Sequence, residues 1–143
     1  MKKSAAFSLM EIMIVVAIIG ALAAMVGPRL MGSFGKAQVA TTKATMSTLK
    51  QALQDYNQDI GRFPTEADGG LNALVQRPKG KAGAKWDGPY LEGEEEVPED
   101  AWGFEFEYNR PPKKNKGKYK YYEIVSYGED GEDGDSEPIV VGA

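Results

Sequence analysis

The sequence contains no cysteine and no histidine among its 143 residues. The absence of cysteine excludes a disulfide and a thiolate metal site, and the absence of histidine removes the commonest general base and metal ligand. No cofactor fingerprint accompanies the carboxylates, and Ser126 has no histidine to activate it. We therefore expect a protein that is not an enzyme.

The chain also lacks an excess of positive charge. Its formal net charge is −4 at pH 7, from 17 lysines and arginines against 21 acids. An acidic body of this kind gives no support for a nucleic-acid partner. No internal repeat is visible, and the length leaves room for one anchor helix and one small domain.

One long apolar run extends from Phe7 to Leu30, and Glu11 is its only charge before Arg29. As a helix with a rise of ~1.5 Å per residue, residues 7–28 would reach roughly 33 Å, about the thickness of a hydrocarbon core. A carboxylate inside such a run costs on the order of 2.5–3.5 kcal/mol. We predict a single membrane span at about residues 7–30 and a partner that neutralises Glu11.

The residues on either side of this run indicate its orientation. Lys2 and Lys3 precede it, and no small-residue cleavage pattern follows it. By the positive-inside rule, the N-terminus lies in the cytoplasm and the body lies across the membrane. An ordinary uncleaved anchor with an incidental glutamate remains an alternative at this point.

An amphipathic helix is predicted to continue from the apolar run to residue 60, with a kink near Pro28. Its apolar stripe contains Val39, Met46, Leu49, Leu53, Tyr56 and Ile60. This spacing is typical of one helix face that packs on the protein's own core. Gly61 and Pro64 then predict the end of the helix.

The remaining residues, 61–143, are predicted to form a globular domain. Leu71, Leu74 and Val75 indicate a short helix, and residues 79–103 an ordered loop held by aromatic side chains. Alternating side chains predict two strands, 104–108 and 119–126, joined by a basic loop. The expected fold class is α+β, a long N-terminal helix packed on a small antiparallel sheet.

An acidic, glycine-rich segment near the C-terminus is the one candidate ligand site. Its six acids are Glu129, Asp130, Glu132, Asp133, Asp135 and Glu137. Calcium prefers six to eight oxygen ligands, which such a loop offers, although the spacing does not match an EF-hand. The residues by themselves are compatible with either a calcium loop or a solvated acidic turn.

The start of the chain resembles the class III signal of the type IV pilin-like family, through a short basic leader followed by Phe7-Ser8-Leu9-Met10-Glu11. The resemblance implies that a prepilin peptidase removes residues 1–6, cutting between Ala6 and Phe7, and methylates the new amine. Ala6 stands where the family usually has glycine. In the assembled family, the N-terminal ammonium of one subunit pairs with the glutamate that corresponds to Glu11 of its neighbour.

Later motifs resemble the major pseudopilins of type II secretion systems. FPTEADGGLNALVQRP, WDGPYL, VPEDAWGFEFEY and YYEIVSYGEDG occur in the family's order, and the match covers nearly the whole chain. The resemblance implies a homopolymeric filament subunit that drives export of folded proteins across the outer membrane. Its implied partners are minor pseudopilins and an inner-membrane assembly platform. Its implied location is the bacterial inner membrane, with the globular domain in the periplasm.

The same resemblance implies one bound calcium. Alignment on residues 126–131 assigns the carbonyl of Tyr127 and the carboxylate of Asp130 as ligands. The second acidic ligand is left open between Asp135 and Glu137, with Asp133 as a further candidate. The family's usual C-terminal close is replaced here by Pro-Ile-Val-Val at 138–141.

Two alternative functions share some of these features. A type IV pilus pilin has the same leader and helix, but it commonly carries a disulfide-closed loop, which a chain without cysteine cannot form. A membrane-anchored calcium-binding module would retain its leader, because it needs no prepilin processing.

Overall fold

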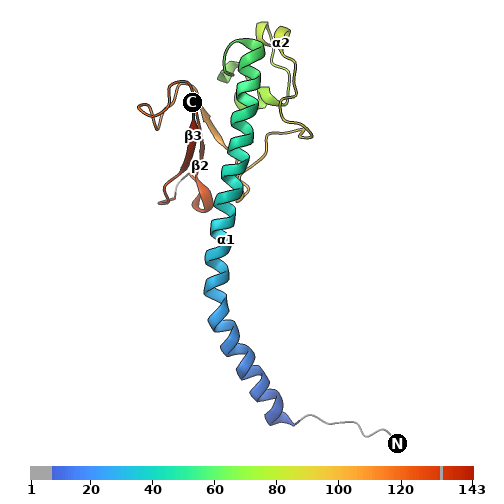
Figure 1. The fold of residues 1–143 in the computed structure, drawn as a ribbon, viewed down its shortest axis with the longest axis vertical. Coiled ribbons are helices and arrows are strands. Elements are labelled where there is room, and N and C mark those ends of the chain that lie inside the picture. Colours follow the sequence, from blue (N-terminus) through green and yellow to red (C-terminus); the bar gives the residue numbers. More distant parts are fainter. Residues whose placement is uncertain (1–7, 133) are drawn as a thin grey trace, which may run out of the picture. The chain divides into compact units, whose positions relative to one another are not determined.

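The computed structural model describes residues 8–132 and 134–143 of this chain (Figure 1). The chain forms two separately packed units, one that ends at Ala37 and one that spans Gln38–Ala143. Helix α1 (Leu9–Ile60) contributes to both of them.

The N-terminal unit consists of the first part of α1. The helix passes through Pro28 without a break, as the apolar pattern predicts, and the kink near Pro28 stays a prediction. Among the described residues, one helical segment, residues 9–26, is long and apolar enough to cross a membrane. Its 18 residues correspond to about 27 Å of helix, close to the hydrocarbon thickness of a bilayer.

In the second unit, α1 supplies one side of the hydrophobic core. Met46, Leu49, Leu53 and Tyr56 are fully buried, which confirms the predicted apolar stripe. They pack in one cluster with Leu74, Tyr122 and Ile124, among other residues. The helix ends at Ile60, and Gly61 follows with φ of +86°, a left-handed conformation that glycine adopts without strain.

The other side of the core is a three-stranded antiparallel sheet in the order β1-β2-β3. Its strands are β1 (Glu107–Asn109), β2 (Glu123–Ser126) and β3 (Ile139–Gly142). Tyr108 pairs with Ile124, which in turn pairs with Val141 on the other side. The predicted class, a long helix with a small antiparallel sheet, is therefore confirmed.

The third strand corrects the sequence analysis, which predicted two strands and left the C-terminal residues in a loop. Residues 139–142 instead pair with β2 in antiparallel register. A run of three β-branched residues is too short for its alternation to be recognised. It becomes a strand because the exposed edge of β2 supplies the hydrogen-bonding partners.

The segments between α1 and the sheet are short helical turns. They are the 3₁₀ helices η1 (Glu66–Asp68) and η2 (Gly70–Leu74) and the single-turn helix α2 (Lys81–Lys85). Helix α2 lies in the stretch that was predicted to be a loop. The aromatic anchoring predicted there is observed, since Trp86 is buried and its indole N–H donates to the Ala73 carbonyl at 2.8 Å.

Truncation of Leu53 should test the core. Leu53→Ala deletes three buried carbon atoms and should lower the free energy of unfolding by about 2–5 kcal/mol. Gln54→Ala, the exposed neighbour on the same helix, should change it by less than about 0.5 kcal/mol. Urea unfolding of the full chain in detergent measures both; equal effects would contradict the burial of this face.

Candidate functional site

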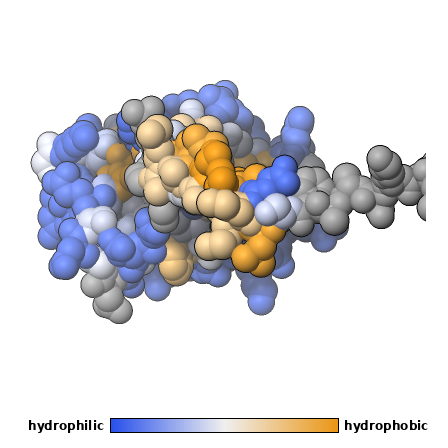
Figure 2. Space-filling model, turned by 90° about the horizontal axis from the view of Figure 1, so that it is seen from below, coloured by the Kyte–Doolittle hydropathy of each residue, from blue (hydrophilic) through white to orange (hydrophobic). Residues whose placement is uncertain are grey.

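The apolar end of α1 is the first candidate functional feature. Every described side chain from residue 8 to 26 is exposed, and Leu9, Met10 and Met25 expose 81%, 71% and 69% of their surface. Figure 2 shows hydrophobic side chains, in orange and tan, gathered in the foreground where this end of α1 faces the viewer. A patch of this length is typical of a membrane or protein contact.

The start of α1 has a side-chain cap that the sequence analysis did not identify. The hydroxyl of Ser8 accepts the backbone N–H of Met10 at 3.3 Å, and its carbonyl accepts the N–H of Glu11 at 3.0 Å. A serine followed three residues later by a glutamate is the sequence signal for such a cap. Glu11 therefore lies in the first helical turn. Ala6 and Phe7, the predicted processing site, lie outside the described residues.

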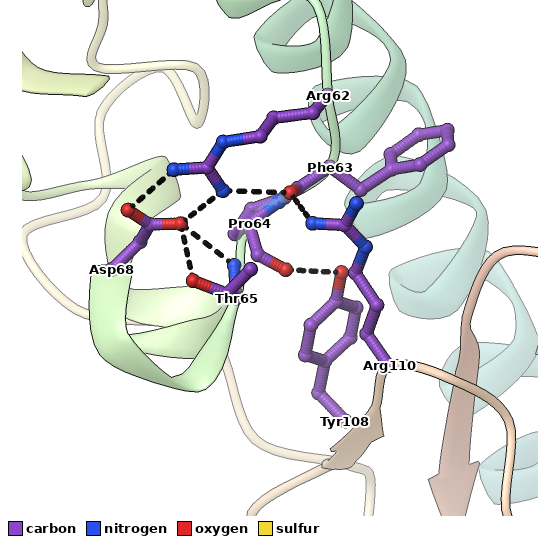
Figure 3. A network of polar contacts seen from close by, with 7 residues as sticks. All are labelled: Arg62, Phe63, Pro64, Thr65, Asp68, Tyr108 and Arg110. Atoms are coloured by element: carbon purple, nitrogen blue, oxygen red, sulfur yellow. Dashed lines mark hydrogen bonds and ion pairs between the residues drawn. The ribbon is translucent and has the colours of Figure 1, made fainter. Parts of the chain in front are cut away.

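A polar network joins the end of α1 to the sheet (Figure 3). The guanidinium of Arg62 forms two hydrogen bonds with the carboxylate of Asp68, at 2.5 and 2.9 Å. Asp68 also accepts the backbone N–H and the hydroxyl of Thr65 at 2.8 and 2.6 Å. From the sheet side, the Tyr108 hydroxyl donates to the Pro64 carbonyl at 3.0 Å, and Arg110 donates to the Phe63 carbonyl.

This network has an electrostatic consequence for Asp68. Its hydrogen bond with Arg62 is the main cause that lowers the pKa of the Asp68 carboxyl, and it outweighs the opposing effect of burial. The Asp68 side chain is 8% exposed but that of Arg62 is 40% exposed, so solvent still screens the pair in part. The network fixes the turn after α1 and hence the position of the sheet against the helix.

A second buried carboxylate holds the C-terminal end of β2. Asp100 is 6% exposed, and its Oδ1 accepts the backbone N–H groups of Trp102 and Phe104, each at 3.0 Å. Its Oδ2 accepts the Ser126 hydroxyl at 2.6 Å. These bonds turn the backbone at 100–104, so β1 begins at Glu107 and not at Phe104 as predicted. They also fix Ser126, the last residue of β2, which the acidic loop follows.

The acidic loop starts with the 3₁₀ turn η3 (Gly128–Asp130) and returns on itself. The Ser136 hydroxyl donates to the Asp130 carboxylate. A Cβ at position 134 would lie 2.0 Å from the Cβ of Asp130, so the return requires glycine at 134. The hydroxyl of Tyr127 donates to Glu107 on β1, which holds the first turn against the sheet.

The structure does not bring the predicted acidic calcium ligands together within the described residues. Asp130, Asp135 and Glu137 are all exposed, and Asp133 lies outside the described residues. Asp130 accepts a hydrogen bond from Ser136, a residue that was not predicted to take part in the site. Across residues 8–132 and 134–143, no three acidic side chains come close enough to hold one metal ion. The donor types that meet here, a carboxylate and a hydroxyl, are oxygen ligands that suit a hard cation.

Comparisons with known families give two matches. The model described as "Type II secretion system (T2SS), protein G" matches residues 29–141, and the model described as "Prokaryotic N-terminal methylation motif" matches residues 1–27. Together they include both the apolar helix and the acidic loop.

Individual proteins agree with the family models. The chain is 34% identical to a type II secretion system core protein G of Aeromonas hydrophila, over 96% of this chain and 92% of that protein. It is 35% identical to the Pseudomonas aeruginosa core protein G, over 95% and 91%. A crystal structure of the major pseudopilin from the type 2 secretion system of enterohaemorrhagic Escherichia coli matches with a TM-score of 0.59 and 28% identity, covering 79% of this chain and 93% of that one.

Asp68→Asn should reveal the strength of the network at the end of α1. Because the pKa of Asp68 is lowered in the folded state, its contribution is complete above the ordinary aspartate pKa of about 3.9 and declines below it. At pH 7 the substitution should cost about 1.5–3 kcal/mol, the range for hydrogen bonds to charged groups. The difference from wild type should shrink as the pH falls below about 4.

Urea unfolding of the full chain at pH 7 and at pH 3 measures this difference. Glu66→Gln is the matched control, since it removes the charge of an exposed acid in the same 3₁₀ helix. A pH-independent cost for Asp68→Asn would show that its charge does not stabilise the fold.

Proposed function

The chain belongs to the type II secretion system protein G family, and we propose that α1 polymerises it into a pseudopilus that drives the export of folded proteins across the outer membrane. It is a structural subunit of that family's filament, a major pseudopilin. The pilus-pilin and anchored-module alternatives are not favoured, because the matching family model covers residues 29–141, most of the chain.

The observation that carries this function is the exposed apolar segment 9–26. Among the described residues, no other part of the chain covers these side chains. The segment anchors the free subunit in a membrane. In a filament, the equivalent segments of other copies would replace lipid as the apolar surroundings. Head-to-tail contacts of this kind form an open fibre when the rotation between successive copies does not close into a ring.

Processing by a prepilin peptidase would prepare the subunit for assembly. The N-terminal methylation motif at residues 1–27 supports cleavage between Ala6 and Phe7 and methylation of Phe7. The new ammonium at Phe7 would pair with Glu11 of a neighbouring copy. An isolated carboxylate is costly in an apolar environment, and a paired one recovers much of that cost, so assembly would be favoured only in the register that brings the two charges together.

The remaining partners and the orientation follow from the family and from the flanking charges. Lys2 and Lys3 support a cytoplasmic N-terminus and a periplasmic globular domain. Minor pseudopilins and an inner-membrane assembly platform are the proposed partners in building the fibre. New subunits would leave the membrane at its base and push secreted proteins outward.

The acidic loop is proposed to bind one calcium ion. The Asp130 carboxylate and the Tyr127 carbonyl are the proposed ligands, with Asp133, Asp135 and Glu137 as candidates for the second acid. The hydrogen bond between Ser136 and Asp130 supports the proposal, because it brings the two sides of the loop together around oxygen donors. The ion would neutralise acids that otherwise repel one another.

Glu11→Ala should abolish fibre formation. Removal of the carboxylate leaves the neighbouring ammonium unpaired in apolar surroundings, so we expect a loss of about tenfold or more in fibres sheared from overproducing cells. Electron microscopy and immunoblotting of the sheared fraction measure this loss. Met13→Ala, at another exposed position of the same segment, should leave fibres nearly unchanged.

Intact-mass measurement of each variant provides the second control. Wild type and both variants should begin at Phe7 and carry one added methyl group. Normal amounts of fibre from processed Glu11→Ala protein would refute the pairing.

Asp130→Asn should weaken calcium binding by at least about tenfold, because calcium affinity depends on the number of charged ligands. Calorimetric titration of the full chain in detergent with calcium chloride measures the change. Glu95→Gln removes an equal charge from an exposed acid outside the loop and should bind like wild type. Equal binding by Asp130→Asn and wild type would remove Asp130 from the ligand set.

A further inference from the structure

A rigid basic loop joins β1 to β2. Its exposed lysines are Lys113, Lys114, Lys116, Lys118 and Lys120. The loop lies beside the C-terminus, where the backbone N–H groups of Lys120 and Tyr121 donate to the Ala143 carbonyl at 2.9 and 2.7 Å (Figure 1). We call residues 113–120 the lysine loop.

A buried carboxylate holds the lysine loop in place. Glu123 is fully buried on β2, and it accepts the backbone N–H groups of Lys113, Lys114 and Asn115 at 2.8, 2.7 and 2.9 Å. Burial by itself would raise the pKa of Glu123, but these bonds outweigh it and keep the pKa below its ordinary value. The carboxylate therefore stays charged, and it fixes the loop backbone while the lysine side chains remain in solvent.

Most of these lysines have no acidic partner within the described residues of their own chain. The Nζ of Lys114 lies 3.8 Å from the Oε2 of Glu107. The other ion pair among the described residues joins Arg62 and Asp68, away from this loop. Lys113, Lys116, Lys118 and Lys120 therefore form no ion pair within the described residues, although Lys118 and Lys120 lie over the rings of Tyr119 and Tyr121. An acidic surface would lower the electrostatic free energy of this group of like charges.

The same domain carries an acidic groove of about 420 Å³ beside β1. Leu71 and Phe106 are buried side chains that contribute apolar wall, while Glu96, Glu99 and Glu105 are exposed along it. These glutamates are not among any set of three acids that could hold one metal ion, as far as the described residues extend. Their exposed carboxylates give this wall of the groove a negative charge.

We propose that the lysine loop of one subunit docks into the acidic groove of a neighbouring copy in the fibre. Lysine suits this groove because its hydrocarbon stem packs on apolar wall while its ammonium meets a carboxylate. The loop and the groove are different surfaces of one domain, so their contact is heterologous and can repeat along an open fibre. This inference rests on the proposed polymerisation, because the fibre supplies the high local concentration that weak surface pairs need.

Cross-linking between two co-produced full-length chains tests the contact. One chain carries Lys116→Cys and the other carries Glu99→Cys or Glu105→Cys, each with its own tag. Because the native sequence has no cysteine, a disulfide between the two tagged chains identifies this contact alone. We expect at least about tenfold more cross-linked pair than with Lys81→Cys, an exposed lysine on α2, in place of Lys116→Cys.

Charge reversal gives a second, independent measurement. Lys116→Glu with Lys118→Glu, or Glu99→Lys with Glu105→Lys, should each lower the fibre yield about tenfold, which corresponds to about 1.4 kcal/mol of lost surface pairing. Combining all four substitutions should restore most of the yield. High salt should weaken the wild-type contact, since the charges are exposed.

The outcomes separate this inference from the proposed function. No cross-link from either glutamate position in samples that contain fibres would overturn the docking and leave polymerisation intact. A groove reversal without effect, as expected if the lysines instead bind anionic lipid, would also overturn it. The absence of fibres from the wild-type chain would count against polymerisation itself.

Discussion

Apolar surface left in water costs roughly 25 cal/mol for each Å², and α1 exposes such surface along residues 9–26. Nothing else in the described chain covers it, so the subunit must enter a bilayer or join other copies. In the proposed assembly, Glu11 would favour other copies over lipid, because lipid offers its carboxylate no counter-charge and the ammonium of a neighbouring N-terminus would. One apolar helix with one acid would thus both anchor the free subunit and favour assembly in a defined register.

In the globular unit, shielded carboxylates hold turns and loops in place by accepting hydrogen bonds from them. Asp68, Asp100 and Glu123 are each largely shielded from solvent, and each gathers several donors from a turn or loop. A buried carboxylate that accepts several N–H groups repays its desolvation and fixes the backbone that donates to it. In a small domain with three short strands, these bonds give order to segments that the sheet cannot organise.

This order determines which charges the domain presents. Glu123 fixes the lysine loop, and Asp100 fixes the residue from which the acidic loop begins. Each exposed charge pair contributes little by itself, about 0–1 kcal/mol, so such contacts orient neighbouring subunits more than they hold them together. The larger stabilisation of a fibre would come from its apolar helices.

The sequence by itself determined the membrane segment, the stripe from Met46 to Ile60 and the hairpin of β1 and β2, because hydrophobic periodicity is a local property of the chain. Only the tertiary structure decided that residues 139–142 form a strand, that β1 begins at Glu107, and that Ser136 meets Asp130. It also decided that Glu123, an acid within the predicted strand 119–126, is buried and accepts hydrogen bonds from the lysine loop. Such features depend on partners that are distant in the chain: a short strand needs an edge to pair with, and a buried carboxylate needs donors that only the folded loops bring to it.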